Sequence, residues 1–113
     1  MSEYSKENLL IRPGAGEKSG SHLFVKVHAS QLNNEYSVME GTMEPGSLLA
    51  PHTHQREDQV VVILTSELEF QVGGEGGERF TAPAGSYVIK PRAIEHTFWN
   101  ATNEPSRYIE LSG

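Results

Sequence analysis

The chain has 113 residues and a formal net charge of -6, from 9 Lys and Arg against 15 Asp and Glu, which suits one compact domain. It has no cysteine, so disulfides, thiol nucleophiles and cysteine-ligated zinc sites are excluded. Basic clusters, a secretory signal and an apolar run of about 20 residues are all missing from the sequence. We therefore expect a cytoplasmic protein that binds neither nucleic acid nor membrane.

Residues 1–21 are expected to form a flexible amino-terminal arm, because Pro13, Gly14, Gly16 and Gly20 oppose regular structure. Residues 22–113 are expected to form the folded domain. Its short runs are rich in Val, Ile, Phe, Tyr and Thr: HLFVKVH, EYSVMEGTM, DQVVVILTS, ELEFQVG, ERFTA, SYVIK, EHTFWN and RYIELS. Turn signals separate almost all of them, which predicts an all-β barrel or sandwich of about eight or more antiparallel strands.

The alternation of side chains along each expected strand indicates which residues face inward. Gln59, Val61 and Ile63 share one face, so a polar residue begins an otherwise apolar inward row. His96 and Phe98 share a face in the same way. This pattern predicts polar groups at one end of an apolar interior.

The run PHTHQREDQ holds the strongest chemical signal. His52 and His54 lie two residues apart, so on a strand their imidazoles project to one side and suit two adjacent ligands on one metal ion. Gln59 follows, and His96 could supply a third imidazole. Two alternatives remain at this point: the pair could be solvated histidines on a loop after Pro51, or Gln59 could be a polar residue that does not bind the ion.

Both of these segments resemble the two motifs of the cupin superfamily. The first motif, G-x5-H-x-H-x3,4-E-x6-G, is matched by Gly46, His52, His54, Gln59 and Ser66. The second, G-x5-P-x-G-x2-H-x3-N, is matched by Gly85, Pro91, Ala93, His96 and Asn100. The resemblance covers residues 37–111 and implies a double-stranded β-helix (jelly-roll) barrel. It also implies one divalent metal ion on His52, His54, Gln59 and His96, and zinc, nickel, manganese or iron would suit these donors.

Three residues depart from the cupin pattern. Ser66 and Ala93 replace glycines, and we expect slightly different turns there. Gln59 replaces the usual glutamate, which leaves a first shell without protein charge and removes the base used by flavonol-cleaving cupins. Uronate-linearising cupins also carry glutamine at this position. Those proteins use an acid, an aromatic and an arginine near the carboxyl terminus, and here only Glu110 could stand for the acid.

The resemblance favours an enzyme that uses the metal as a Lewis acid on a small oxygenated substrate, with isomerase, lyase or cyclase chemistry. Glu110 is the candidate catalytic base, although it could point to solvent instead. Phe98, Tyr108 and Ile63 are the candidate substrate-pocket residues. Two alternatives remain open, an iron-dependent dioxygenase like the quercetinases and a non-catalytic cupin that binds or senses a small ligand.

The strand HLFVKVH also suggests a contact between subunits. Leu23, Val25 and Val27 form an apolar face that could pair with a second copy, which predicts a homodimer. His22 and His28, on the opposite face of that strand, are expected to be surface or interface histidines.

Overall fold

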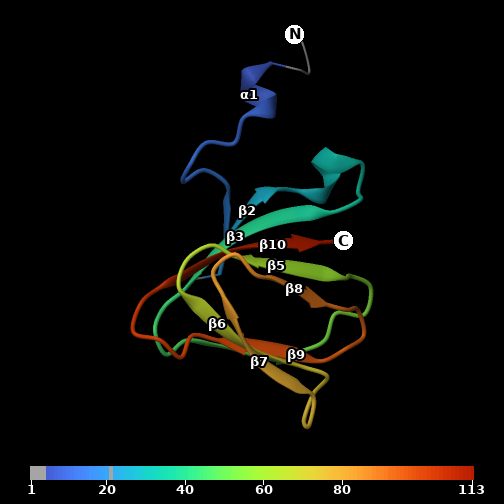
Figure 1. The fold of residues 1–113 in the computed structure, drawn as a ribbon. Coiled ribbons are helices and arrows are strands. Elements are labelled where there is room, and N and C mark those ends of the chain that lie inside the picture. The colour runs from blue at the N-terminus through green and yellow to red at the C-terminus, as the bar shows by residue number, and fades with distance from the viewer. Residues whose placement is uncertain (1–4, 21) are drawn as a thin grey trace.

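The computed structural model describes residues 5–20 and 22–113 (Figure 1). The helical elements are α1 (Lys6–Leu9) and the 3-10 helix η1 (Ala29–Leu32). The strands are β1 (Glu17–Ser19), β2 (Leu23–Val27), β3 (Ser37–Met43), β4 (Leu48–His52), β5 (Gln59–Ile63), β6 (Glu67–Val72), β7 (Glu78–Pro83), β8 (Tyr87–Lys90), β9 (His96–Trp99) and β10 (Ser106–Ser112). The described part of the chain thus has ten strands, which confirms the all-β prediction.

The strands form two antiparallel sheets. The larger has the order β1-β2-β3-β10-β5-β8, and the smaller has the order β4-β9-β6-β7. Within the described residues no strand of one sheet is paired with a strand of the other, so backbone hydrogen bonds do not close the sheets into a barrel. This arrangement is consistent with a double-stranded β-helix.

The core lies between the two sheets and follows the alternation expected from the sequence. In β5, Gln59, Val61 and Ile63 are buried, whereas the intervening valines are only half-buried. In the opposite, smaller sheet, Phe98 on β9 packs on its cross-strand partner Phe70 on β6, with ring centroids 5.2 Å apart. The buried apolar residues are Met43, Val61, Ile63, Leu68, Phe70, Ala82, Val88, Phe98 and Tyr108.

The amino-terminal segment contains two short regular elements. The four residues of α1 are exposed, and the helix stands apart from the sheets in Figure 1. Further on, β1 pairs with β2 and extends the larger sheet. The expected arm of residues 1–21 therefore contributes an edge strand, while its residues 1–4 and 21 lie outside the described part. No helix among the described residues is long and apolar enough to cross a bilayer.

The apolar face of β2, which the sequence analysis predicted to contact a second subunit, points toward the core at Leu23. Leu23 packs against the buried core, and Val25 and Val27 are half-buried. Phe24, on the other face, is the exposed apolar residue of this strand. Because Leu23 packs against the core of its own chain, this face no longer supports the homodimer, which stays a prediction.

Two turns keep the backbone geometry that usually requires glycine. Ser66 has a φ of 60° and Ala93 a φ of 63°, both in the left-handed region. These are the two positions where the sequence departs from motif glycines, and we expected altered turns there. The structure instead retains left-handed turns, at the energetic cost of a Cβ in that conformation.

Candidate metal centre

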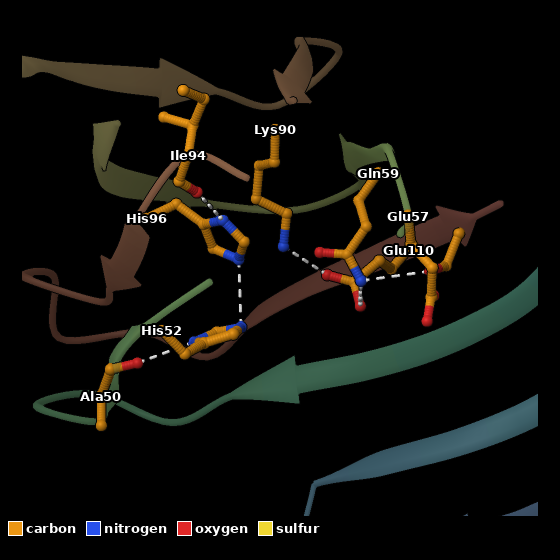
Figure 2. A network of polar contacts seen from close by, with 9 residues as sticks. Ala50, His52, Glu57, Gln59, Lys90, Ile94, His96 and Glu110 are labelled. Carbon is orange, nitrogen blue, oxygen red and sulfur yellow. Dashed lines mark hydrogen bonds and ion pairs between the residues drawn. The ribbon is translucent and has the colours of Figure 1, made fainter. Parts of the chain in front are cut away.

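Two strands of the smaller sheet bring three histidines together. β4 ends at His52 and β9 begins at His96, and these two residues are cross-strand partners. His54 lies two residues beyond the end of β4. The cluster therefore forms where the smaller sheet gives way to loops, and Figure 2 shows His52 and His96 at this place.

The geometry of the three imidazoles suits a single ion. One nitrogen from each of His52, His54 and His96 lies within 4.8 Å of the other two, and the Nε2 atoms of His52 and His96 are 3.0 Å apart. His96 is fully buried, and His52 and His54 are half-buried. His52 and His54 thus lie in a cluster with a third imidazole, which argues against the alternative of an isolated, solvated pair.

Backbone carbonyls orient two of the rings. Nδ1 of His52 lies 2.8 Å from the Ala50 oxygen, and Nδ1 of His96 lies 3.3 Å from the Ile94 oxygen. An N–H at Nδ1 donates to each carbonyl and leaves Nε2 with a free lone pair, which is the arrangement found behind metal-bound histidines. Burial lowers the pKa of His96 to about 4, helped by the charge of Lys90 and by the other imidazoles. His96 is therefore neutral at pH 7 and able to bind a cation.

Gln59 is buried beside this cluster and lines the same cavity. Its Nε2 lies 3.4 Å from Oε1 of Glu110 and 3.3 Å from Oγ of Ser112. Its Oε1 is buried and has no hydrogen-bond partner among the described residues. A buried acceptor without a hydrogen-bond partner is suited to bind a cation, so Gln59 fits the role of the predicted fourth ligand.

A buried ion pair lies next to Gln59. Nζ of Lys90 is 2.6 Å from Oε2 of Glu110, and both side chains are almost completely buried. Burial lowers the pKa of Lys90, and Glu110 opposes this shift. Of the two orientations that the sequence left open for Glu110, the structure has the inward one. Sequence reasoning missed Lys90, although alternation from the buried Val88 would have placed it on the inward face of β8.

The cavity beside the histidines has a volume of about 260 Å³, near the lower end for ligand pockets. Of the three candidate substrate-pocket residues, Phe98 and Tyr108 line this cavity, whereas Ile63 packs in the core and is not among its lining residues. Its wall consists of His22, Leu23, Ser37, Met39, Leu49, His52, His54, Glu57, Gln59, Phe98, Tyr108, Glu110 and Ser112. His22, expected at the surface or an interface, is thus half-buried at this cavity.

Comparison with known proteins agrees with this geometry. The family model of the cupin domain matches residues 39–112. The chain belongs to the cupin family. This cupin shares its fold with many solved structures, but no curated protein sequence is detectably similar to it.

Three structural neighbours of this cupin carry informative descriptions. A predicted oxalate decarboxylase from Thermotoga maritima has a TM-score of 0.73 and 19% identity, over 80% of this chain and 76% of its own. KdgF from Halomonas sp. has a TM-score of 0.68 and 19% identity, over 80% and 74%. A structure of oxalate oxidase has a TM-score of 0.67 and 17% identity, over 87% of this chain but 54% of its own. At these identities the likeness establishes the fold alone.

Proposed function

We propose that this cupin is an enzyme that binds one divalent metal ion and uses it as a Lewis acid on a small oxygenated molecule, with isomerase, lyase or cyclase chemistry. The observation that carries the proposal is the convergence of three imidazole nitrogens, two of them from residues that line a small cavity shared with the buried carboxylate of Glu110. His52, His54 and His96 would hold the ion, with Oε1 of Gln59 as the fourth donor. When bound, the ion supplies charge stabilisation for a substrate oxygen.

The side chains of the cavity provide the remaining parts of the chemistry. Glu110 lines the cavity and is ion-paired with Lys90, and its carboxylate is the group proposed to accept a proton from a bound substrate. Phe98 and Tyr108 present apolar ring surfaces that hold the carbon skeleton and exclude water. A small cavity lined by both apolar and polar side chains suits a compact oxygenated molecule.

The neutral donor set also supports a second candidate, an oxygen-dependent reaction. Imidazole and amide ligands bind iron as well as zinc or nickel, so the donors alone do not choose between redox and non-redox chemistry. One structural neighbour is an oxalate oxidase, and another is described as a predicted oxalate decarboxylase. An iron-dependent dioxygenase, which the donor set also allows, is the alternative that the experiment must distinguish from the Lewis-acid enzyme.

Metal content and proton exchange together test the proposal. The protein is purified without added metal and analysed by elemental mass spectrometry. It is then incubated without oxygen in deuterated water with enolisable dicarbonyl compounds, and exchange of the acidic C–H is followed by NMR. We expect one bound divalent ion per chain and exchange that depends on the protein, because the cavity combines a cation site with a base.

Variants identify the residues responsible. His54→Ala should lose the ion and the exchange, whereas His28→Ala, which removes an exposed histidine outside the cluster, should retain both. Oxygen uptake with iron-loaded protein and catechol-like or enol compounds, without anaerobic exchange, would favour the dioxygenase. A protein that binds an ion and a small ligand but shows neither reaction would be a binding or sensing cupin.

A further inference from the structure

The clearest feature not explained by the metal ligands is the polar row across the larger sheet. On β5, which lies between β10 and β8, Gln59 is the cross-strand partner of Ser112 on β10 and of Lys90 on β8. Glu110, two residues before Ser112, reaches back to contact both Gln59 and Lys90. All four of these side chains are buried, so an unmatched donor or acceptor among them is costly.

The matching fixes which way the Gln59 amide points. Glu110 is ion-paired with Lys90 and can only accept, so the atom of Gln59 that faces it must be the N–H donor. The Ser112 hydroxyl donates to Glu57, so its oxygen also accepts from Gln59. A flipped amide would place its carbonyl oxygen against the carboxylate of Glu110.

The carbonyl of Gln59 is consequently directed away from Glu110 and Ser112. Figure 2 shows Oε1 on the side of the amide nearer His52 and His96, with Nε2 on the opposite side. Because Oε1 is buried without a partner in the described residues, its position is set by the bonds that Nε2 makes. The hydrogen bonds of Nε2, and not any contact of Oε1 itself, therefore determine where the carbonyl oxygen points.

The same contacts explain why a carboxylate is disfavoured at position 59. A glutamate there would place a second negative oxygen near Oε1 of Glu110, which is 3.4 Å from the present amide nitrogen. One ammonium, that of Lys90, would face two buried carboxylates. Unpaired charge in such a site is costly, and like charges at this distance repel.

We propose that the Lys90–Glu110 ion pair both aims the Gln59 carbonyl at the histidine cluster and requires an amide at position 59, which makes the metal shell neutral. The inference rests on the proposed metal site. Glu110 and Lys90 act here as positioning residues.

A charge-swap experiment tests the coupling. Gln59→Glu, Glu110→Gln and the double variant are compared by thermal unfolding in the presence of a chelator. We expect Gln59→Glu to lower Tm by about 5–10 °C, because it adds an uncompensated buried carboxylate. The double variant keeps one carboxylate beside Lys90 and should recover most of that loss. Glu78→Gln, which neutralises an exposed carboxylate on β7, should leave Tm unchanged and not alter the effect of Gln59→Glu.

Cobalt binding tests the aiming of the oxygen. Cobalt affinity is measured by competition with a chelating dye, and coordination by the visible absorption of the ion. Glu110→Gln should weaken cobalt binding about 10- to 100-fold and change the spectrum, because an amide at position 110 no longer dictates the orientation of Gln59. If the buried Lys90 prevents this variant from folding, Lys90→Met with Glu110→Gln provides the same test without a lone charge.

The outcomes separate this inference from the proposed function. Equal Tm values for the wild type and Gln59→Glu without metal, or cobalt affinity unaffected by Glu110→Gln, would overturn the inference while leaving the metal site intact. Absence of cobalt binding in the wild type would overturn the proposed function and the aiming of the oxygen. Recovery of Tm in the double variant would then still establish the charge coupling.

Discussion

His52 and His96 face each other across β4 and β9, and their Nε2 atoms lie 3.0 Å apart. Two neutral imidazoles at this distance can share one proton or one cation. Because both Nδ1 atoms are directed at backbone carbonyls, the pair presents lone pairs to a common point. This relationship gives the first prediction.

Loss of one imidazole should abolish tight metal binding. Replacement of His52 by alanine removes one metal ligand and leaves His96 without its facing imidazole. Affinity for zinc or cobalt should therefore fall by more than about 100-fold. The measurement is competition with a chelating dye, with circular dichroism to confirm folding. His28→Ala serves as the control, and an unchanged affinity in His52→Ala would exclude this cluster as the site.

The stability of the metal-free protein should fall as the solution becomes acidic. Burial lowers the pKa of His96 to about 4, below the value near 6.5 of an unfolded histidine, so the unfolded state binds a proton more readily. The contribution is fully present above pH 6.5 and is lost as the pH falls from there toward 4. Urea unfolding with a chelator at several pH values measures this.

The control for the pH prediction is a variant without the titrating ring. His96→Gln should be less stable at pH 7 but should show a flatter dependence between pH 6.5 and 4. Parallel profiles for the two proteins would mean that other groups cause the dependence.

Breaking the buried ion pair from one side should be strongly destabilising. Lys90→Met leaves the carboxylate of Glu110 buried without its 2.6 Å partner, which should lower the free energy of unfolding by about 3–5 kcal/mol. Adding Glu110→Gln should restore much of this loss. Urea unfolding at pH 7 provides the values, and the exposed Arg92–Asp58 pair offers a comparison. Arg92→Met should have a far smaller effect, because solvent screens that pair.

A glycine at position 93 should stabilise the protein. Ala93 has a φ of 63°, so Ala93→Gly relieves the strain of a left-handed alanine and should raise the free energy of unfolding by about 0.5–1 kcal/mol. Ala101, which does not have a positive φ, gives the matched control. Ala101→Gly should be neutral or destabilising, and the same result for Ala93→Gly would contradict the prediction.

Gly41 should not tolerate a side chain. A Cβ at this position would overlap the ring of Tyr108, its cross-strand partner, so Gly41→Ala should destabilise the fold by about 1–3 kcal/mol. Tyr108→Leu in the same chain should recover part of the loss by making room. If Gly41→Ala alone leaves the unfolding midpoint unchanged, the close packing of Tyr108 on β3 is incorrect.

Local patterns in the sequence were sufficient for the strands and for the convergence of the histidines. Alternation placed Gln59 and Phe98 on inward faces, because a side-chain period of two is a property of any strand. The spacing of His52 and His54 and the motif around His96 predicted a shared site. These features depend on short stretches of chain.

Features that depend on distant contacts were harder to predict. Lys90 was overlooked because a lysine in a β run is normally solvent-exposed, and only the carboxylate of Glu110, twenty residues away, makes its burial acceptable. Ile63 shares a face with Gln59, but alternation does not give depth along the strand, and Ile63 lies in the core beyond the cavity. Leu23 was assigned to a subunit contact because its packing against the core depends on sheet order.

The rings of His52 and His96 each pair, through Nδ1, with the backbone carbonyl two residues earlier in the chain. Because those acceptors belong to the main chain, replacing the side chains of Ala50 or Ile94 leaves the acceptors in place. Substitutions at these two positions therefore keep the tautomer in which Nδ1 carries the proton and Nε2 has a free lone pair. Side chains near the metal ligands can therefore change, and with them the shape of the cavity, while the Nε2 atoms of His52 and His96 remain able to bind a cation.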